Sequence, residues 1–345
     1  MKSFRLRVPA LAAAAVLLSA PTPLTAAVVS ADFASDPLQQ GWNVFGDTNL
    51  FHWNSARGQL DVTWDSTRPN SYFYHPLPWN LTRFDDFQIE FDLVLSNIVS
   101  GVEPGKTGPM QLAVGFLNLA GATSAQFMRG SYGSAPNVAE FDYYTEGYYK
   151  DSETIYPAPA TATPSFISGV NSFDYAPSIL SVYEIVLSTQ QVVHVTLAYT
   201  AISQTAALSI RTNGVPAAAL PPLVLDPAHG FADDDDFDVD VFSISSYSSA
   251  GDPFDSLRAH GAVSNVVVTL PEPVRNLAGG WQNGVWQAWF DGRTNWMFTL
   301  ERSTNGAAWS AVSASVPGTA GAMVLSDTNL SLPERALYRV GARRP

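Results

Sequence analysis

Hydrophobic and polar residues alternate over short runs through most of the chain, a period that is typical of strands with one buried face. In residues 87–95 the odd positions are Phe, Ile, Phe, Leu and Leu, whereas the even positions are Gln, Glu, Asp and Val. Residues 193–199 repeat this pattern, and a further run leads into Asn213-Gly214, a strong signal for a hairpin turn. After residue 27 no stretch of 12 or more residues shows capped helical periodicity. The sequence therefore predicts an all-β protein with two stacked antiparallel sheets.

The first 27 residues have a different character. Lys2, Arg5 and Arg7 precede an apolar run over residues 9–18, and small residues follow up to Ala27. This order is typical of a secretory signal peptide, so we predict a signal peptide over residues 1–27 and a secreted or cell-surface protein. No later apolar run approaches the ~20 residues of a membrane-spanning helix, and we expect no membrane insertion.

The charge of the chain excludes one class of partner. The sequence has 18 Lys and Arg residues against 31 Asp and Glu residues, a formal net charge of −13. Removal of the predicted signal peptide takes away three positive charges and leaves Lys106 and Lys150 as the only lysines. Such a protein repels phosphate backbones, so nucleic acid is not an expected partner. The absence of cysteine also excludes thiol catalysis and cysteine-ligated metals.

The densest candidate chemistry lies in residues 138–151. If this segment begins as a strand, alternate side chains share a face, and Phe141 and Tyr143 lie on the opposite one. The first face would carry Glu140, Asp142, Tyr144 and Glu146. Carboxylates at alternate positions suit a metal ion or a sugar.

The run Glu140-Phe141-Asp142 resembles a strand of legume lectins and their relatives in the concanavalin A-like superfamily, which contains sugar-binding proteins and glycoside hydrolases. Residues 28–33 and 263–270 resemble the terminal strands that pair side by side in such folds. Residues 191–199 resemble a back-sheet strand. The resemblance implies an antiparallel two-sheet jelly roll over residues 28–270.

A second domain is expected at the C-terminal end. Pro and Gly residues over 271–280 predict a linker, and residues 281–345 contain five of the nine tryptophans. The pattern over residues 298–303, together with Trp309 and residues 338–340, resembles a small fibronectin-III-like β-sandwich of secreted bacterial proteins. This resemblance implies a spacer or a module for cell-surface attachment.

Two groups of acids are candidate calcium ligands. For the first group the superfamily resemblance implies a site formed by Glu140, Asp142, Glu146 and Asp151. The family's metal-binding His falls at Tyr156, so calcium is favoured over a transition metal. The second group is the acidic run 233–240, which lacks the Gly and Glu of an EF-hand loop. Its candidate ligands are Asp234, Asp236 and Asp238. In both groups the alternative is a solvated acidic surface.

Three functions fit these features. The favoured one is a secreted, lectin-like protein that binds a polysaccharide or other glycan, with calcium as a candidate cofactor. Its ligand-binding residues would be the exposed aromatic side chains Tyr144, Tyr148 and Tyr149. The alternative for these tyrosines is a place in the core.

The second function is an endo-acting glycoside hydrolase of the laminarinase-like type. The resemblance then assigns Glu140 as nucleophile, Asp142 as its modulator and Glu146 as acid/base. In an extended strand the Cα atoms of Glu140 and Glu146 would lie about 20 Å apart, whereas a retaining mechanism needs carboxyl groups ~5–5.5 Å apart. The third function is a non-catalytic adhesion or scaffold protein.

Overall fold

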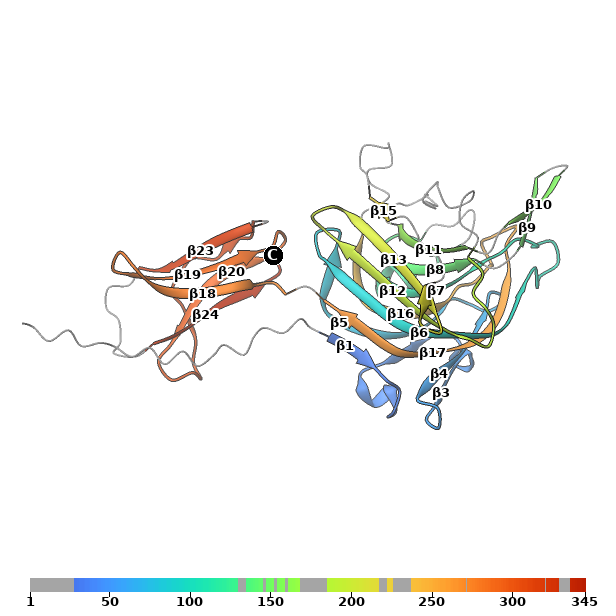
Figure 1. The fold of residues 1–345 in the computed structure, drawn as a ribbon, viewed down its shortest axis with the longest axis horizontal. Helices are drawn as coiled ribbons and strands as arrows, with labels where there is room; N and C mark the ends of the chain where they lie inside the picture. Colours follow the sequence, from blue (N-terminus) through green and yellow to red (C-terminus); the bar gives the residue numbers. More distant parts are fainter. Residues whose placement is uncertain are drawn as a thin grey trace, which may run out of the picture. The chain divides into compact units, whose positions relative to one another are not determined.

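The computed structural model divides the chain at residue 271 into two compact units, which are described separately (Figure 1). The described residues are 28–129, 135–144, 147–151, 154–158, 161–167, 185–216, 222–225, 237–270, 272–319, 321–328 and 336–345. The predicted signal peptide lies outside them. Among the residues described, no helix is long and apolar enough to cross a membrane.

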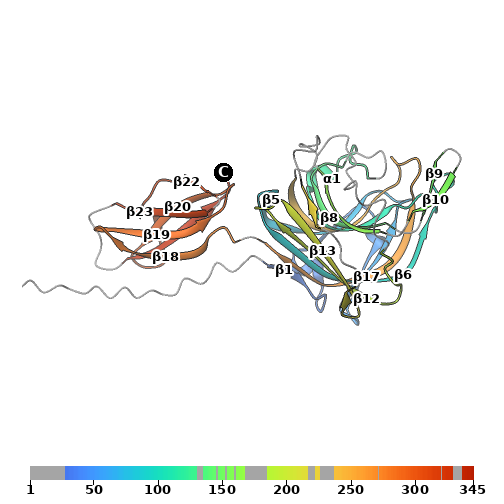
Figure 2. The ribbon, with the colours of Figure 1, turned by 45° about the horizontal axis from the view of Figure 1, so that its top comes forward.

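The first unit is an antiparallel jelly-roll sandwich of two sheets, as predicted (Figures 1 and 2). The nine-stranded sheet has the order β14-β13-β12-β6-β17-β4-β3, with β1 paired to β17 and β15 to β13. Its strands are β1 (Val28–Ala31), β3 (Phe51–Asn54), β4 (Gln59–Asp65), β6 (Phe87–Ser100), β12 (Val192–Thr200), β13 (Thr205–Thr212), β14 (Val215–Pro216), β15 (Leu223–Val224) and β17 (Leu257–Thr269).

The six-stranded sheet has the order β11-β8-β7-β16-β5-β2. Its strands are β2 (Asn43–Phe45), β5 (Ser71–Thr82), β7 (Gln111–Leu117), β8 (Val138–Tyr144), β11 (Thr161–Ile167) and β16 (Asp238–Ser246). The hairpin of β9 (Gly147–Asp151) and β10 (Thr154–Ala158) extends away from the sandwich in both ribbon views. Short helical turns complete the unit: η1 (Pro37–Gln40), η2 (Thr48–Leu50) and α1 (Leu119–Ala122).

The core between the two sheets is formed by the buried residues of strands in which apolar and polar residues alternate. The odd residues over 87–95 of β6 and over 193–199 of β12 are buried, and the even residues between them are partly exposed, as the sequence pattern predicts. Phe91 of the nine-stranded sheet packs edge-to-face on Phe141 of the six-stranded sheet, with ring centroids 5.6 Å apart. The predicted pairing of the terminal strands is confirmed, because Val28 lies opposite Thr269. The predicted hairpin is also confirmed, since Asn213 and Gly214 both have positive φ, 49° and 81°.

The second unit contains two small sheets. One has the order β18-β19-β23, and in the other β20 pairs with β21, β22 and β24. Its strands are β18 (Arg275–Gln282), β19 (Val285–Gly292), β20 (Met297–Ser303), β21 (Ser310–Ala311), β22 (Val316–Pro317), β23 (Gly321–Asp327) and β24 (Leu337–Arg343). Phe290 and Phe298 contact each other across its core, with ring centroids 5.1 Å apart.

The predicted linker over residues 271–280 is wrong for most of its length, because β18 begins at Arg275. Its glycines serve packing rather than flexibility. A Cβ atom on Gly279 would lie 2.5 Å from Cζ2 of Trp286, so only glycine lets this indole cross the strand. A glycine pair therefore marks an interior strand position here, although the same pair is a common linker signal.

Candidate functional site

The outer face of the six-stranded sheet, opposite the core, has a floor of small side chains. Residues directly opposite each other on paired strands share a face. One row across the sheet runs Tyr74, Ser243, Gly115 and Glu140, and the next runs Tyr72, Ser245, Ala113 and Asp142. In these two rows the central strands, β7 and β16, contribute only Gly, Ala and Ser. Tyrosines of β5 lie on one side of them and acids of β8 on the other.

Gly115 sets the depth of this floor. A Cβ atom at this position would lie 2.3 Å from Cα of Glu140, so no side chain fits between β7 and β8. The close approach leaves room above the strands for larger side chains that arrive from loops. Those side chains are Arg129 and Tyr247.

Arg129 forms ion pairs with both acids of β8. Its Nη2 atom donates to Glu140 Oε1 at 2.5 Å and to both carboxylate oxygens of Asp142 at 3.1 Å. The Arg129 side chain is 0% exposed, and both acids are equally inaccessible. A buried ion pair of this kind needs good geometry and further hydrogen bonds to offset the loss of hydration.

Tyr247 provides one of those further bonds. Its hydroxyl donates to Glu140 Oε2 at 2.7 Å, and Cζ of Arg129 lies 5.1 Å from the centre of its ring. Tyr72 packs edge-on against Tyr247 with ring centroids 6.0 Å apart, and donates its own hydroxyl to the carbonyl of Ala122 at 2.9 Å. We call Arg129, Glu140, Asp142, Tyr247 and Tyr72 the buried polar cluster.

Burial and the attraction between opposite charges shift the pKa values of the groups in the cluster. Burial raises the pKa of Glu140 to about 8, Arg129 opposes this shift, and the neighbouring charge of Asp142 adds to it. Burial alone would lower the pKa of Arg129, but Asp142 and Glu140 hold it well above its usual value. Burial also raises the pKa values of both tyrosines, which stay neutral donors. Burial thus favours the neutral form of Glu140, whereas the attraction of Arg129 favours its charged form.

Gln111 is a buried polar side chain on the same face. It lies directly opposite Tyr144, two positions along β7 from Ala113, and is 2% exposed. Neither its amide nitrogen nor its amide oxygen has a hydrogen-bond partner in the described parts of the protein. An unpaired buried polar group costs about 1–3 kcal/mol, so a partner from outside the chain would be favourable.

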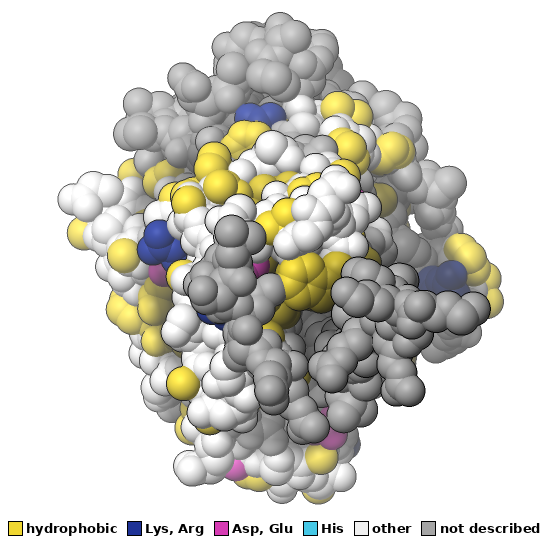
Figure 3. All heavy atoms as spheres, turned by 90° about the vertical axis from the view of Figure 1, so that its left-hand side faces the viewer, with side chains coloured by type: hydrophobic (Ala, Val, Ile, Leu, Met, Phe, Trp, Pro, Cys, Tyr) yellow, Lys and Arg dark blue, Asp and Glu magenta, His cyan; other side chains and the backbone are white. Residues whose placement is uncertain are grey.

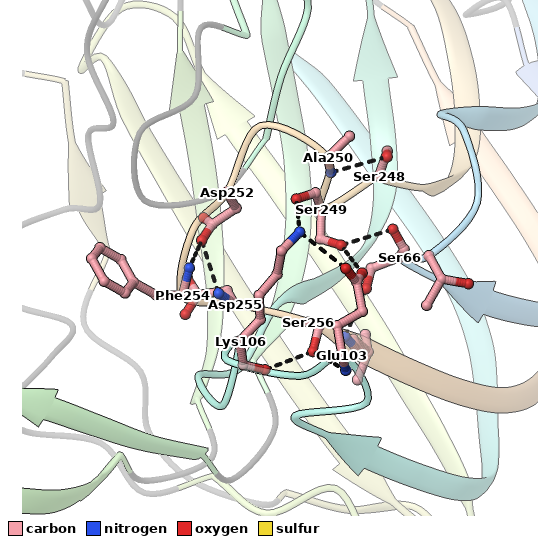
Figure 4. A network of polar contacts seen from close by, with 12 residues as sticks. Ser66, Glu103, Lys106, Ser248, Ser249, Ala250, Asp252, Phe254, Asp255 and Ser256 are labelled. Carbon is pink, nitrogen blue, oxygen red and sulfur yellow. Dashed lines mark hydrogen bonds and ion pairs between the residues drawn. The ribbon is translucent and has the colours of Figure 1, made fainter.

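A second polar network involves the loop that follows Tyr247 in the sequence (Figure 4). Lys106 donates to the carbonyl of Ser249 and forms an ion pair with Glu103 at 3.1 Å. The hydroxyl of Ser256 donates to the carbonyl of Lys106, and the backbone of Ser249 donates to Ser66. These contacts join residues 103–108 to residues 249–256 and limit the movement of Tyr247, two residues before Ser249.

The structure brings Glu140 and Asp142 together, as the strand alternation predicts, and places both on one face with Tyr144. Tyr144, however, is 7% exposed, so the expectation of an exposed ring is wrong for this residue. The reason is its position on an interior strand, between β7 and β11 and opposite Gln111.

The other predicted residues divide into two groups. Glu146, Asp234 and Asp236 lie outside the described residues, and for Tyr148, Tyr149 and Asp151 only the backbone of β9 is described. Asp238 is exposed at the start of β16, where its Oδ1 atom accepts a hydrogen bond from the Asn80 amide at 2.8 Å. The distances of the predicted hydrolase and calcium sites to these residues thus stay predictions.

A calcium ion at Glu140 and Asp142 does not fit the arrangement of their oxygens. Arg129 donates to three of the four carboxylate oxygens, and Tyr247 donates to the fourth. Calcium needs six to eight oxygen ligands that are free to face it. Over the described part of the chain, no group of three or more His, Asp and Glu side chains is placed to hold a metal ion.

The sequence gives little warning of Arg129 or Tyr247. Both lie in loops. Arg129 is 11 residues and Tyr247 is 107 residues from Glu140 in the sequence, and no periodic pattern relates either of them to this acid. Gln111 was detectable in principle, because Gln111, Ala113 and Gly115 alternate with large apolar residues in residues 111–117. That pattern marks a strand with one small and polar face.

Comparison with known proteins gives likenesses at low identity. No protein-family model and no curated relative match the chain. Among solved structures, peanut lectin with a bound nonapeptide shares 15% identity, with a TM-score of 0.41, over 72% of this chain and all of that one. Winged bean acidic lectin with methyl-α-D-galactose shares 12%, with a TM-score of 0.39, over 71% and 99%. A mutant of alginate lyase Aly36B with alginate tetrasaccharide shares 11%, with a TM-score of 0.32, over 71% and 97%.

Proposed function

We propose that the protein binds a glycan on the outer face of the six-stranded sheet. The observation that carries this proposal is the buried, unpartnered amide of Gln111 on that face. A primary amide presents donors and an acceptor side by side, which matches adjacent sugar hydroxyls. Pockets that bind small molecules combine apolar and aromatic walls with a few such polar groups.

Aromatic rings at the edge of the sheet extend the face toward solvent. Phe45 of β2 is 37% exposed and stacks on Tyr72, with ring centroids 5.7 Å apart and an interplanar angle of 15°. Tyr74, in the neighbouring row, is partly exposed. From β2 to β7 the face spans three strand spacings, roughly 14 Å, which is room for an oligosaccharide. Flat rings of this kind suit the apolar faces of sugars.

The charges favour a neutral glycan over an acidic one. Arg129 is the cation of the cluster, and it is already paired with two carboxyl groups. The chain as a whole carries a formal charge of −13. A uronic acid polymer would therefore meet general repulsion, which the already paired Arg129 is poorly placed to offset.

Binding fits the acids better than hydrolysis does. Glu140 and Asp142 are buried, paired with one arginine and hydrogen-bonded through every oxygen. A nucleophile needs a free oxygen within reach of the substrate. Binding therefore ranks above the hydrolase alternative.

The test is binding of the exported protein to matched neutral and uronate-rich polysaccharides, measured by calorimetry. We expect binding to a neutral polymer, and a loss of at least about tenfold in affinity, 1.4 kcal/mol, for Gln111→Leu. Gln88→Leu, on the outer face of the nine-stranded sheet, is the control and keeps full affinity. Equal affinity of the Gln111→Leu variant, or no binding to any polymer, would contradict the proposal.

The proposal also includes export and attachment through the C-terminal unit. In that unit the first two strands, β18 and β19, lie in one sheet with β23, whereas β20 and β24 share the other sheet, a division that immunoglobulin-like and fibronectin-III-like sandwiches use. Trp281 and Val324 are each about half exposed. In the view of Figure 3 hydrophobic side chains appear at several places on the surface of the molecule. Two large apolar side chains exposed on one small unit favour an attachment surface.

Attachment is tested by fractionating cells that export the protein. We expect the protein in the cell-surface fraction, and a shift to the medium for Trp281→Ala with Val324→Ser. Wild-type protein found entirely in the medium would contradict attachment, without affecting the glycan site.

A further inference from the structure

We infer that Arg129 takes the place of a metal ion and acts as the built-in cation around which Glu140 and Asp142 are positioned. The inference concerns how the site is held together, and it stands or falls separately from the proposed glycan binding. Its consequence is that the folded state of this site needs no calcium.

The geometry of the donors is the first reason. A single nitrogen, Arg129 Nη2, reaches Glu140 Oε1 and both oxygens of Asp142 within 3.1 Å. It thus bridges the two carboxyl groups from one point, as a coordinated ion would. The remaining oxygen, Glu140 Oε2, accepts from the Tyr247 hydroxyl.

Charge balance is the second reason. Two carboxyl groups and one guanidinium are enclosed with two neutral tyrosine hydroxyls, and all five side chains are buried. A divalent ion added to this group would bring further positive charge into a buried site in which Arg129 already faces both carboxyl groups. The cost of such a charge is large in a buried environment.

The path of the chain is the third reason, because one side chain anchors both the segment before Arg129 and the residue after Tyr247. Asn70 donates from its amide nitrogen to the carbonyl of Phe127 at 3.0 Å and accepts from the backbone of Ser248 at 2.8 Å. One side chain thus fixes the segment before Arg129 and the residue after Tyr247. Met128 packs so closely on Gly251 that a Cβ there would lie 2.2 Å from its sulfur.

Arg129 is therefore a positioning residue, and its partners on β8 are the groups it positions. Lysine is not an equivalent replacement, because its single ammonium lacks the planar set of donors. Methionine keeps much of the length of the side chain and removes the charge.

The experiment is thermal unfolding of the full exported protein in EDTA and in millimolar calcium. Variants are Arg129→Met, Asp142→Asn, and a triple variant with Arg129→Met, Glu140→Gln and Asp142→Asn. We expect the same wild-type Tm in both solutions and a drop of roughly 10 °C for Arg129→Met. The triple variant should recover most of that drop, because it removes the charge of the arginine and of both acids. The triple variant keeps the test informative if Arg129→Met alone fails to fold.

A further expected result is specific to the inference. In Arg129→Met the two carboxyl groups lose their cation, so calcium should raise the Tm of this variant, by linkage of binding to folding. A wild-type Tm that rises in calcium, with the rise abolished by Asp142→Asn, would overturn the inference. A calcium-dependent rise that Asp142→Asn keeps belongs to another site and leaves the inference supported.

Discussion

The outer faces of the two sheets of the jelly roll carry similar residue types in very different surroundings. On the nine-stranded sheet, Asp92 and His194 lie opposite each other, partly exposed, with His194 Nδ1 2.7 Å from Asp92 Oδ1. On the six-stranded sheet, Glu140 and Asp142 occupy alternate positions of one strand, but they are inaccessible to solvent and paired with Arg129. An exposed acid is stabilised by water, whereas a buried acid needs a partner from the protein.

An alternating sequence pattern identifies the residues that share one face of a strand, but it does not show whether solvent or other segments of the chain cover that face. The same apolar–polar period describes residues 87–95 and residues 138–144. Only the first set of polar residues faces solvent. Ligand chemistry is therefore to be sought where polar residues are buried on an outer face, which in this protein is the six-stranded sheet.

The largest expected contrast between the faces comes from their arginines. Arg129→Met should lower the free energy of unfolding by about 3–5 kcal/mol, because it leaves two buried carboxyl groups without a cation. Arg258, on the nine-stranded sheet, is 47% exposed and pairs with Asp65 at 3.0 Å. Arg258→Met should cost about 1 kcal/mol or less. Chemical denaturation of both variants measures the contrast, and equal losses would show that the two faces do not differ in this way.

A smaller contrast concerns glycines. Gly115→Ala places a Cβ against the backbone of Glu140, and we expect a loss of about 1–3 kcal/mol from overpacking. Gly121→Ala, in α1, is the matched control, because its Cβ would lie 3.5 Å from the nearest atom, Asn118 Oδ1. The control should be neutral or slightly stabilising. Denaturation midpoints compare the pair, and a neutral Gly115→Ala would mean that β7 and β8 are less tightly spaced than described.

Tyrosine hydroxyls provide the next test. Tyr247→Phe removes the donor to Glu140 Oε2 and should cost about 1–2 kcal/mol. Tyr199, on the nine-stranded sheet, donates to the carbonyl of Arg83 at 2.7 Å, so Tyr199→Phe removes a bond between neutral groups. Its expected cost is about 1 kcal/mol. A Tyr247→Phe variant that is more stable than Tyr199→Phe would contradict the role given to the Tyr247 hydroxyl.

The last expected contrast is a dependence on pH rather than the effect of one substitution. Since the pKa of Glu140 is raised to about 8 in the folded protein, the folded state holds a proton that the unfolded state has released. Stability from this group is complete below the ordinary glutamate pKa and is lost as pH rises toward 8. We expect Tm to fall across this window in the wild type and to fall less in Glu140→Gln. A slope unchanged in Glu140→Gln would contradict the raised pKa of Glu140.

Much of the fold was predictable because it depends on local patterns. The period of two along residues 87–95 and 193–199 defines strands, and Asn213-Gly214 defines a turn whose positive φ values few other residues adopt. The pairing of residues 28–31 with 266–269 followed from the family resemblance rather than from any local pattern.

The site was only half predictable. Glu140 and Asp142 stand two residues apart on one strand, so their shared face follows from the sequence. Arg129 reaches them from a loop, and its position depends on Asn70, on Met128 against Gly251 and on the small floor of β7 and β16. Such contacts are set by tertiary packing, which leaves no spacing to detect in the sequence. The acids were therefore predicted as a metal or catalytic pair, whereas the structure pairs them with an arginine.

The most direct test of the proposed glycan site is hydrogen–deuterium exchange of the whole protein, with and without a neutral oligosaccharide taken from a polymer that it binds. We predict new protection in residues 111–117 of β7 and in residues 71–75 of β5, and none on β12 or β13 of the nine-stranded sheet. Protection confined to the nine-stranded sheet or to residues 272–345 would contradict the claim that the outer face of the six-stranded sheet is the glycan site.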